Sequence, residues 1–130
     1  MIISDLMPGI LLCRHAATSK KQLLETLCRR TAQHAGLCER TVLDAVIERE
    51  KLGSTAIGDG IALPHATVAG ATTTSMLLAT LEQPVDFGSP DGQPVDIVML
   101  VLGNARDGAG HLAALGVVSD QLRASSHFLR

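Results

Sequence analysis

The sequence predicts an α/β sandwich, in which helices cover a central β-sheet. Two observations lead to this fold class. Segments with helical periodicity occur both before and after a central region of short, strand-like segments. The apolar runs at 76–81 and 95–102 also have the length of strands and are bounded by polar or turn residues, as expected for strands covered on both faces.

The chain is predicted to form one domain that spans residues 1–130. Its 130 residues are enough to bury a hydrophobic core without disulfides or metal ions as cross-links. The composition, 46% hydrophobic and 18% charged, excludes a disordered chain. With two Phe and no Trp or Tyr, the core must be built from Leu, Val, Ile, Ala and Met.

Charge and apolar segments indicate a cytoplasmic protein with neither nucleic-acid binding nor membrane insertion. A formal net charge of −2 provides no electrostatic attraction to nucleic acids or anionic membranes. The run from Ile97 to Leu102 is far shorter than the ~20 residues of a membrane-spanning helix, and without a basic leader no secretory signal is expected. The odd set of three cysteines lacks CxxC spacing, so neither a disulfide framework nor a zinc site is expected. Cys28 and Cys38 are expected to pack as small core hydrophobes.

Two amphipathic helices are predicted in the first half of the chain. The first covers 19–35, where Ser19 and Gln22 form a capping box and Gly36 ends the helix. The second covers about 39–51, although no strong N-cap residue precedes it. The apolar positions are Leu23, Leu24, Leu27, Cys28, Thr31 and Ala32 in the first helix and Val42, Leu43, Val46 and Ile47 in the second.

After Gly53 the sequence changes to short β-prone segments separated by glycines. Strands are predicted at 54–57 and 61–63, with a break at Pro64-His65. The two apolar runs at 76–81 and 95–102 are the longer strands. Between them, 82–94 is rich in Pro, Gly, Asp and Ser and is predicted to be a loop.

The last predicted element is a helix at about 108–123. Asp107 is its expected N-cap. Its expected buried stripe consists of Leu112, Leu115, Val118 and Leu122. With this helix after the strands and two helices before them, the elements complete the sandwich.

The stretch 58–65, Gly-Asp-Gly-Ile-Ala-Leu-Pro-His, is the most unusual in the sequence. Its two glycines relax the backbone, and Pro64 fixes the approach to His65. Such a sequence can orient a side chain, and an imidazole can accept a phosphoryl group and release it again without a metal or an organic cofactor. The alternative is a hydrogen-bonded loop histidine, which is the commoner role for a lone histidine beside a proline.

This stretch resembles the signature of the IIA proteins of the bacterial phosphotransferase system (PTS), of the fructose and mannitol type, in which a glycine-rich strand leads into Pro-His. The similarity extends over about 19–122. It implies a three-layer sandwich with a mixed β-sheet flanked by helices and with His65 in a shallow surface cleft. It also implies a phosphotransferase that works through a phosphohistidine intermediate, with no cofactor and no metal.

The resemblance further implies three site residues. His65 corresponds to the phosphoryl acceptor, Arg49 to an arginine on the preceding helix, and His111 to a second histidine that opens the last helix. A guanidinium can neutralise phosphate oxygens, and the first turn of a helix offers free N–H groups to an anion. Without the resemblance, Arg49 would be an exposed residue paired with Glu48 or Glu50, and His111 an ordinary surface histidine.

The partners that the resemblance implies are other proteins. The donor would be a small phosphocarrier of the HPr kind, and the acceptor in sugar-transporting members is a cysteine of a IIB component. The segments 19–21 and 53–58 are similar to the nitrogen-regulatory branch, in which the phosphorylation state regulates partner proteins. Two alternatives stay open: a fructose- or mannitol-specific IIA component, and a transfer-inactive regulatory binding module of the same fold.

Three features depart from the family pattern. The loop 103–106 lacks an expected proline, and Ala66 stands where glycine is common. The chain ends at Arg130, whereas family members continue into further C-terminal structure. We therefore expect a domain that is truncated at its C-terminus, which would affect stability and partner docking.

Overall fold

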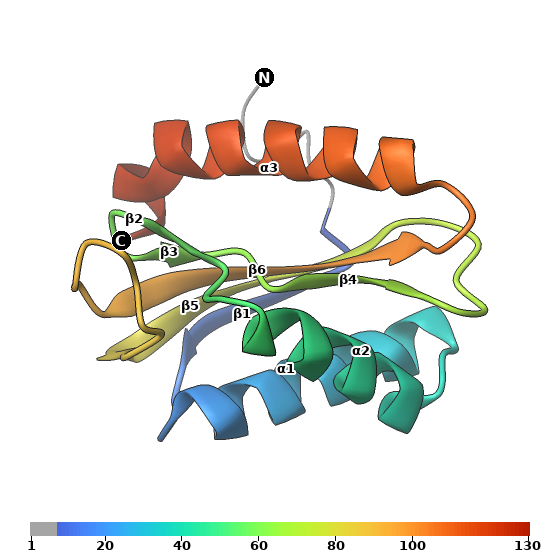
Figure 1. Cartoon of the computed structure of the whole chain (residues 1–130). Coiled ribbons are helices and arrows are strands. Elements are labelled where there is room, and N and C mark those ends of the chain that lie inside the picture. Colours follow the sequence, from blue (N-terminus) through green and yellow to red (C-terminus); the bar gives the residue numbers. More distant parts are fainter. Residues whose placement is uncertain (1–7) are drawn as a thin grey trace.

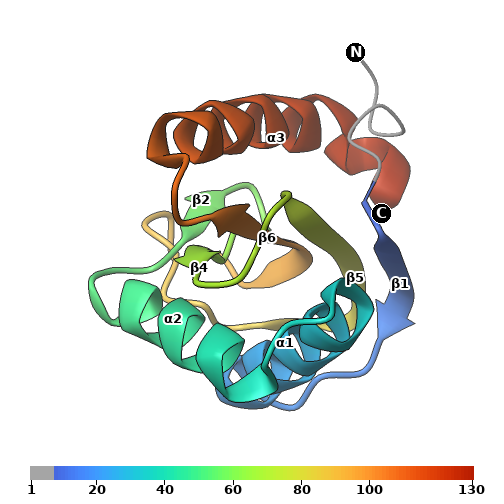
Figure 2. The same cartoon turned by 90° about the vertical axis from the view of Figure 1, so that its right-hand side faces the viewer.

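The chain folds into three layers, with a β-sheet between two layers of helices (Figure 1). The computed structural model describes residues 8–130. Helices α1 (Lys20–Ala35) and α2 (Glu39–Lys51) cover one face of the sheet, and α3 (Gly108–Leu129) covers the other. Figure 2 shows the same arrangement after a 90° turn, with α3 across the sheet from α1 and α2. The predicted three-layer α/β sandwich is confirmed.

The sheet is mixed, as the family resemblance implies. Among the described residues it has six strands in the order β1-β5-β6-β3-β2, and β4 also pairs with β6. The central pair β5 and β6 is antiparallel, β1 runs parallel to β5, and both β3 and β4 run parallel to β6. The strands are β1 (Ile10–His15), β2 (Ala56–Gly58), β3 (Ile61–Ala62), β4 (His65–Val68), β5 (Ser75–Val85) and β6 (Val95–Asn104).

The sheet divides the hydrophobic core into two halves. Successive side chains of a strand point to opposite faces, so alternate residues of β6 belong to different halves. The half beneath α1 and α2 contains Val98, Leu100 and Leu102 of β6 with Leu23, Leu27, Val42 and Val46 of the helices. The half beneath α3 contains Ile97, Met99 and Val101 of β6 with Val118 and Leu122.

Helices α1 and α2 lie where the sequence predicts them. The Ser19 hydroxyl accepts a hydrogen bond from the Gln22 backbone N–H at 3.1 Å, while the Gln22 side chain accepts from the N–H of Thr18 at 3.3 Å. The capping box is therefore present with its return contact moved by one residue. Gly36 ends α1 in the left-handed conformation, with φ of +70°.

Helix α3 corrects the prediction at two points. It continues to Leu129, six residues beyond the predicted end, and Asp107 caps it by accepting the N–H of Gly110 at 2.9 Å. The buried stripe is also different, because Leu112 is 70% exposed and His111 is 7% exposed. The helix is rotated so that the His111 ring, rather than Leu112, faces the sheet, where Gly103 of β6 leaves room for it.

The strand predictions need three corrections. The break predicted at Pro64-His65 lies one residue earlier, at Leu63-Pro64, because β3 ends at Ala62 and β4 begins at His65. Strand β4 then resumes the parallel pairing with β6 that β3 began. Strand β5 extends to Val85, so the predicted loop 82–94 is shorter. Strand β1 was not predicted, because an edge strand that is half exposed shows little hydrophobic patterning.

Cys28 and Cys38 have different environments. Cys28 is fully buried in the core, as expected, and burial raises the pKa of its thiol to about 12. Cys38 is exposed, which corrects the expectation of a core residue. It occupies the N-cap position of α2, where the chain runs over the surface between the two helices.

Candidate functional site

His65 is the first residue of β4 and lies at the point where the chain returns to the sheet after Pro64. The Pro64 carbonyl accepts the N–H of Val101 at 3.0 Å, which keeps the Pro-His step against β6. The Nδ1 atom of the half-buried His65 ring lies 2.8 Å from the carbonyl oxygen of Leu63. Because a carbonyl can only accept a hydrogen bond, Nδ1 carries the proton and Nε2 keeps its lone pair.

The glycines of the 58–65 stretch form a hairpin turn and do not line the His65 pocket. Gly58, Asp59 and Gly60 have φ values of +90°, +57° and +77°, a region that glycine adopts without strain. The Asp91 carboxylate supports the turn by accepting the N–H of Asp59 at 3.0 Å. This turn joins β2 to β3 at the opposite end of the sheet from β4 (Figure 1).

His111 packs close to His65 from the first turn of α3. The two ring centroids are 5.7 Å apart, with the ring planes tilted by 50°. The His111 side chain is buried, and neither of its ring nitrogens has a hydrogen-bond partner among residues 8–130. Burial lowers the pKa of His111, and positive charge on His65 lowers that pKa further. The pair therefore favours an uncharged His111 with one donor and one acceptor nitrogen left unused.

Arg49 lies in the last turn of α2 and is half-buried. Its Nη1 donates to the carbonyl oxygen of Gly53 at 3.0 Å. The alternative of an ion pair with a neighbouring glutamate is wrong, because Glu48 pairs with Lys51 and Glu50 pairs with Lys20. A planar guanidinium has five N–H donors in all. Apart from the one that bonds Gly53, those of Arg49 have no partner among the described residues.

One pocket brings the three predicted residues together. It has a volume of about 420 Å³ and lies between the end of α2, the start of β4 and the start of α3. Its lining combines apolar side chains with one arginine, one glutamate, one threonine and two histidines: Ala45, Glu48, Arg49, Leu52, His65, Ala66, Thr67 and His111. Within residues 8–130 no group of three or more His, Cys, Asp or Glu side chains could hold a metal ion. The pocket therefore places the His65 ring beside one guanidinium and a second imidazole.

Three contributors to the site were not predicted. The Leu63 carbonyl sets the His65 tautomer, Gly103 makes room for the His111 ring, and Leu52 is an apolar side chain, 84% exposed, at the edge of the pocket. A main-chain oxygen has no signature in a sequence. The position of Gly103 at the end of an apolar strand was the only signal available for the second contributor.

The fold and the pocket define a class of protein: a three-layer α/β sandwich with a surface pocket lined by two histidines and an arginine. Residues 9–126 match the family described as "Phosphoenolpyruvate-dependent sugar phosphotransferase system, EIIA 2". The chain belongs to this family, and the resemblance read from the sequence is confirmed.

Three relatives are named as nitrogen regulatory proteins. The chain is 43% identical over 124 residues to the nitrogen regulatory protein of Bradyrhizobium diazoefficiens, covering 95% of this chain and 81% of the relative. It is 37% identical over 105 residues to that of Escherichia coli K12, covering 80% of this chain and 64% of the relative, which is just under two thirds. The crystal structure of the nitrogen regulatory protein IIA-Ntr from Neisseria meningitidis superimposes with a TM-score of 0.80 at 30% identity, covering 89% and 82% of the two chains.

No helix within residues 8–130 combines the length and the apolar character needed to cross a membrane.

Proposed function

We propose that this protein is a cytoplasmic phosphoryl carrier, in which His65 Nε2 takes a phosphoryl group from an HPr-like phosphocarrier protein. The observation that carries the proposal is the 2.8 Å contact between His65 Nδ1 and the Leu63 carbonyl. This contact holds the proton on Nδ1 and leaves the Nε2 lone pair available as the nucleophile. Membership of the EIIA family supports the same chemistry.

The transfer step can be written from these atoms. The Nε2 lone pair attacks the phosphorus of the donor's phosphohistidine, and the new N–P bond forms as the donor's N–P bond breaks. The electron pair of the broken bond stays on the donor imidazole, which takes up a proton from solvent. His65 becomes cationic on phosphorylation, and its Nδ1–H remains bonded to the Leu63 oxygen, which stabilises that charge. Attack by an acceptor on the same phosphorus reverses these events.

Arg49 and His111 are the two further residues that we assign to the transfer. Phosphoryl transfer requires positioning and neutralisation of the charge on the equatorial oxygens. The unused guanidinium donors of Arg49 and a ring N–H of His111 line the same pocket as His65. A phosphoryl group on Nε2 would supply the partner that buried His111 lacks, and its negative charge would raise the pKa of His111 rather than lower it.

The acceptor that we favour is a regulatory target protein rather than a sugar transporter. The relatives with 43% and 37% identity are both named nitrogen regulatory proteins. On this proposal the phosphorylation state of His65 acts as a signal. If the protein were instead a fructose- or mannitol-specific IIA component, a cysteine of a IIB component would discharge His65. A transfer-inactive module would keep the fold without using the free nitrogen of His65.

The test is incubation with purified phosphorylated carriers of the nitrogen and the sugar branches, followed by intact mass measurement. We expect the parent protein to gain one phosphoryl group that is labile in acid and stable in alkali, as a phosphoramidate is. His65→Ala should gain none, whereas His127→Ala, which removes an exposed histidine far along α3, should behave like the parent. Uptake by His65→Ala at the parental level would overturn the proposal. Faster charging by one carrier identifies the branch.

A further inference from the structure

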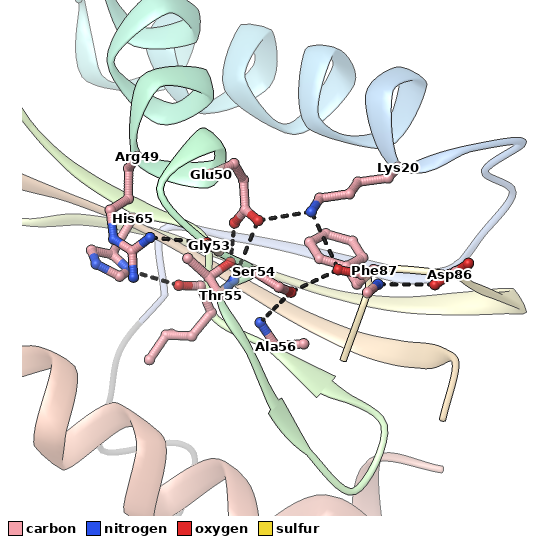
Figure 3. A network of polar contacts seen from close by, with 12 residues as sticks. Lys20, Arg49, Glu50, Gly53, Ser54, Thr55, Ala56, His65, Asp86 and Phe87 are labelled. Atoms are coloured by element: carbon pink, nitrogen blue, oxygen red, sulfur yellow. Dashed lines mark hydrogen bonds and ion pairs between the residues drawn. The ribbon is translucent and has the colours of Figure 1, made fainter. Parts of the chain in front are cut away.

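Glu50 follows Arg49 in the sequence, but the two side chains diverge. Figure 3 shows Arg49 extending toward His65 and Glu50 extending toward Lys20. The Glu50 side chain is buried, which is unusual for a carboxylate. It accepts hydrogen bonds from the Thr55 N–H at 3.2 Å and from the Thr55 hydroxyl, and it forms an ion pair with Lys20 Nζ at 2.8 Å. Nothing in the proposed transfer step uses this buried charge.

The same cluster extends to the segment after β5. Lys20 Nζ also donates to the carbonyl oxygen of Phe87 at 3.3 Å and lies 4.8 Å from the centre of the Phe87 ring. The Ser54 hydroxyl donates to the same Phe87 oxygen at 2.6 Å. The start of α1, the end of α2 and the chain at Phe87 are thereby joined around one carboxylate (Figure 3).

Gly53 lies in the turn beside this cluster and forms a hydrogen bond with Arg49. Its carbonyl oxygen accepts from Arg49 Nη1 at 3.0 Å. Its φ of +154° is a conformation that residues with side chains rarely adopt, and no atom lies within 4 Å of the position that a Cβ would take. The Gly53 N–H donates to the Glu50 backbone carbonyl at 3.2 Å, and the side chains of Glu50, Ser54 and Thr55 anchor the chain on either side of Gly53. These side chains therefore contribute to the place of the Gly53 carbonyl.

We propose that Lys20, Glu50 and Thr55 form a positioning network, which sets the place of the Arg49 guanidinium through the 52–55 turn. The inference rests on the proposed transfer at His65 and adds to it the residues that orient its arginine. A buried ion pair contributes little net stability compared with apolar residues of the same size. Its effect on geometry is larger, since a displacement of about 1 Å at a transfer site can cost roughly 100-fold in rate.

The experiment is a double-mutant cycle between Glu50 and Arg49. Single-turnover transfer from the phosphorylated carrier is measured for the parent, Glu50→Gln, Arg49→Ala and the double variant. Glu50→Gln should lower the transfer rate about 10- to 100-fold. The concentration of donor at half-saturation should change little, because Glu50 is buried and offers almost no surface to a donor protein. In the Arg49→Ala background the same change should cost nothing more, since the effect passes through Arg49.

Two further variants act as rescue and matched control. Thr55→Val should lower the rate and Thr55→Ser should keep it, because serine retains the hydroxyl that donates to Glu50. Arg40→Met removes the exposed ion pair with Asp44 on the same helix and should leave the rate unchanged. Equal losses from Glu50→Gln with and without Arg49 would overturn the proposal. A loss of stability with no loss of rate would do so too.

A readout that needs no phosphoryl transfer separates this inference from the proposed function. In an NMR spectrum the Arg49 side-chain N–H signals report whether the guanidinium is held. We expect restricted guanidinium rotation in the parent and free rotation in Glu50→Gln. If the parent protein took up no phosphate at all, the proposed function would fail, and this measurement would still decide the positioning role: unchanged Arg49 signals in Glu50→Gln would refute it.

Discussion

The His111 ring lies with its centroid 5.7 Å from that of His65, and both of its nitrogens lack a hydrogen-bond partner among residues 8–130. A buried polar group without a partner costs free energy in the resting protein. The His111 ring, with its unpaired nitrogens, lines the same pocket as His65. The two histidines are also coupled electrostatically, because positive charge on His65 lowers the pKa of His111.

The first prediction concerns Arg49. Removing one charge-assisted contact to a transferring group costs about 2 to 4 kcal/mol, or roughly 30- to 1000-fold in rate. Arg49→Ala should fall in this range while its unfolding temperature stays near that of the parent, since the Arg49 side chain forms one hydrogen bond within residues 8–130. A rapid-quench assay of phosphoryl transfer from a phosphorylated carrier measures the rate. Arg40→Ala on the same helix is the control, and a parental rate in Arg49→Ala would remove this residue from the site.

The second prediction concerns His111, where burial changes what the sequence predicts. The stripe predicted from the sequence leaves His111 off the buried face of α3, which would make His111→Ala neutral for stability. The ring is 7% exposed and seated over Gly103, so truncation should destabilise the protein by about 0.5 to 3 kcal/mol. The transfer rate should fall by roughly 30- to 1000-fold as well. His111→Gln keeps a donor and should recover part of the rate, measured alongside urea unfolding; equal rates for the Ala and Gln variants would contradict the donor role.

The third prediction tests how β6 makes room for His111. A Cβ at Gly103 would overlap Nδ1 of His111 and lie 2.8 Å from Cγ of that ring. Gly103→Ala should therefore displace the ring, lower the transfer rate and destabilise the protein by about 1 to 3 kcal/mol through overpacking. Gly116→Ala is the matched control in α3, because nothing lies within 4 Å of its Cβ position and alanine favours a helix. Thermal unfolding and transfer assays distinguish them. Parental behaviour in Gly103→Ala would show that the ring is not fixed by this contact.

The fourth prediction is a pH dependence of stability. The pKa of His111 in the folded protein lies below its unfolded value, because burial disfavours the charged ring and charge on His65 does so as well. Between these two pKa values the unfolded chain binds a proton that the folded protein does not, so the free energy of unfolding falls as the pH falls. Above the unfolded pKa of about 6.5 the group contributes nothing.

Urea unfolding at several pH values between 8 and 5 measures this effect. The parent should lose stability more steeply than His111→Asn once the pH falls below about 6.5. Above that pH the difference in stability between the two proteins should be constant. Identical slopes for the two proteins in the acidic range would show that His111 is protonated equally in both states, contrary to its burial.

Several elements could be predicted because their signals are local. The capped helices depend on Ser19, Gln22 and Gly36, which act on backbone groups within a few residues. The central strands follow from apolar runs too short for helices. The same local patterns did not predict strand β1 (Ile10–His15) or the buried stripe of α3. A half-exposed edge strand lacks a clear apolar pattern, and a buried histidine is polar where an apolar residue is expected.

The site could be predicted only in part. The Pro64-His65 step is a local signal, and the family resemblance pointed to Arg49 and His111. Glu50 had no such signal, since it stands in a run of four charged residues, 48–51, that is typical of a solvated helix end. Its burial arises because Lys20, thirty positions earlier, and Thr55 meet it in the folded protein.

The sequence by itself determined the fold class, the two helices of the first layer and the central strands, and it singled out His65 as the candidate acceptor. These depend on periodicity, capping and a Pro-His step, which are interactions between near neighbours in the chain. Only the tertiary structure decided which nitrogen of His65 is free, how His111 is buried and what holds Arg49. Each of these depends on close contacts between distant segments, and the burial of His111 also depends on how α3 is rotated against the sheet. The packing free energies that select these arrangements have no signature in a local sequence pattern.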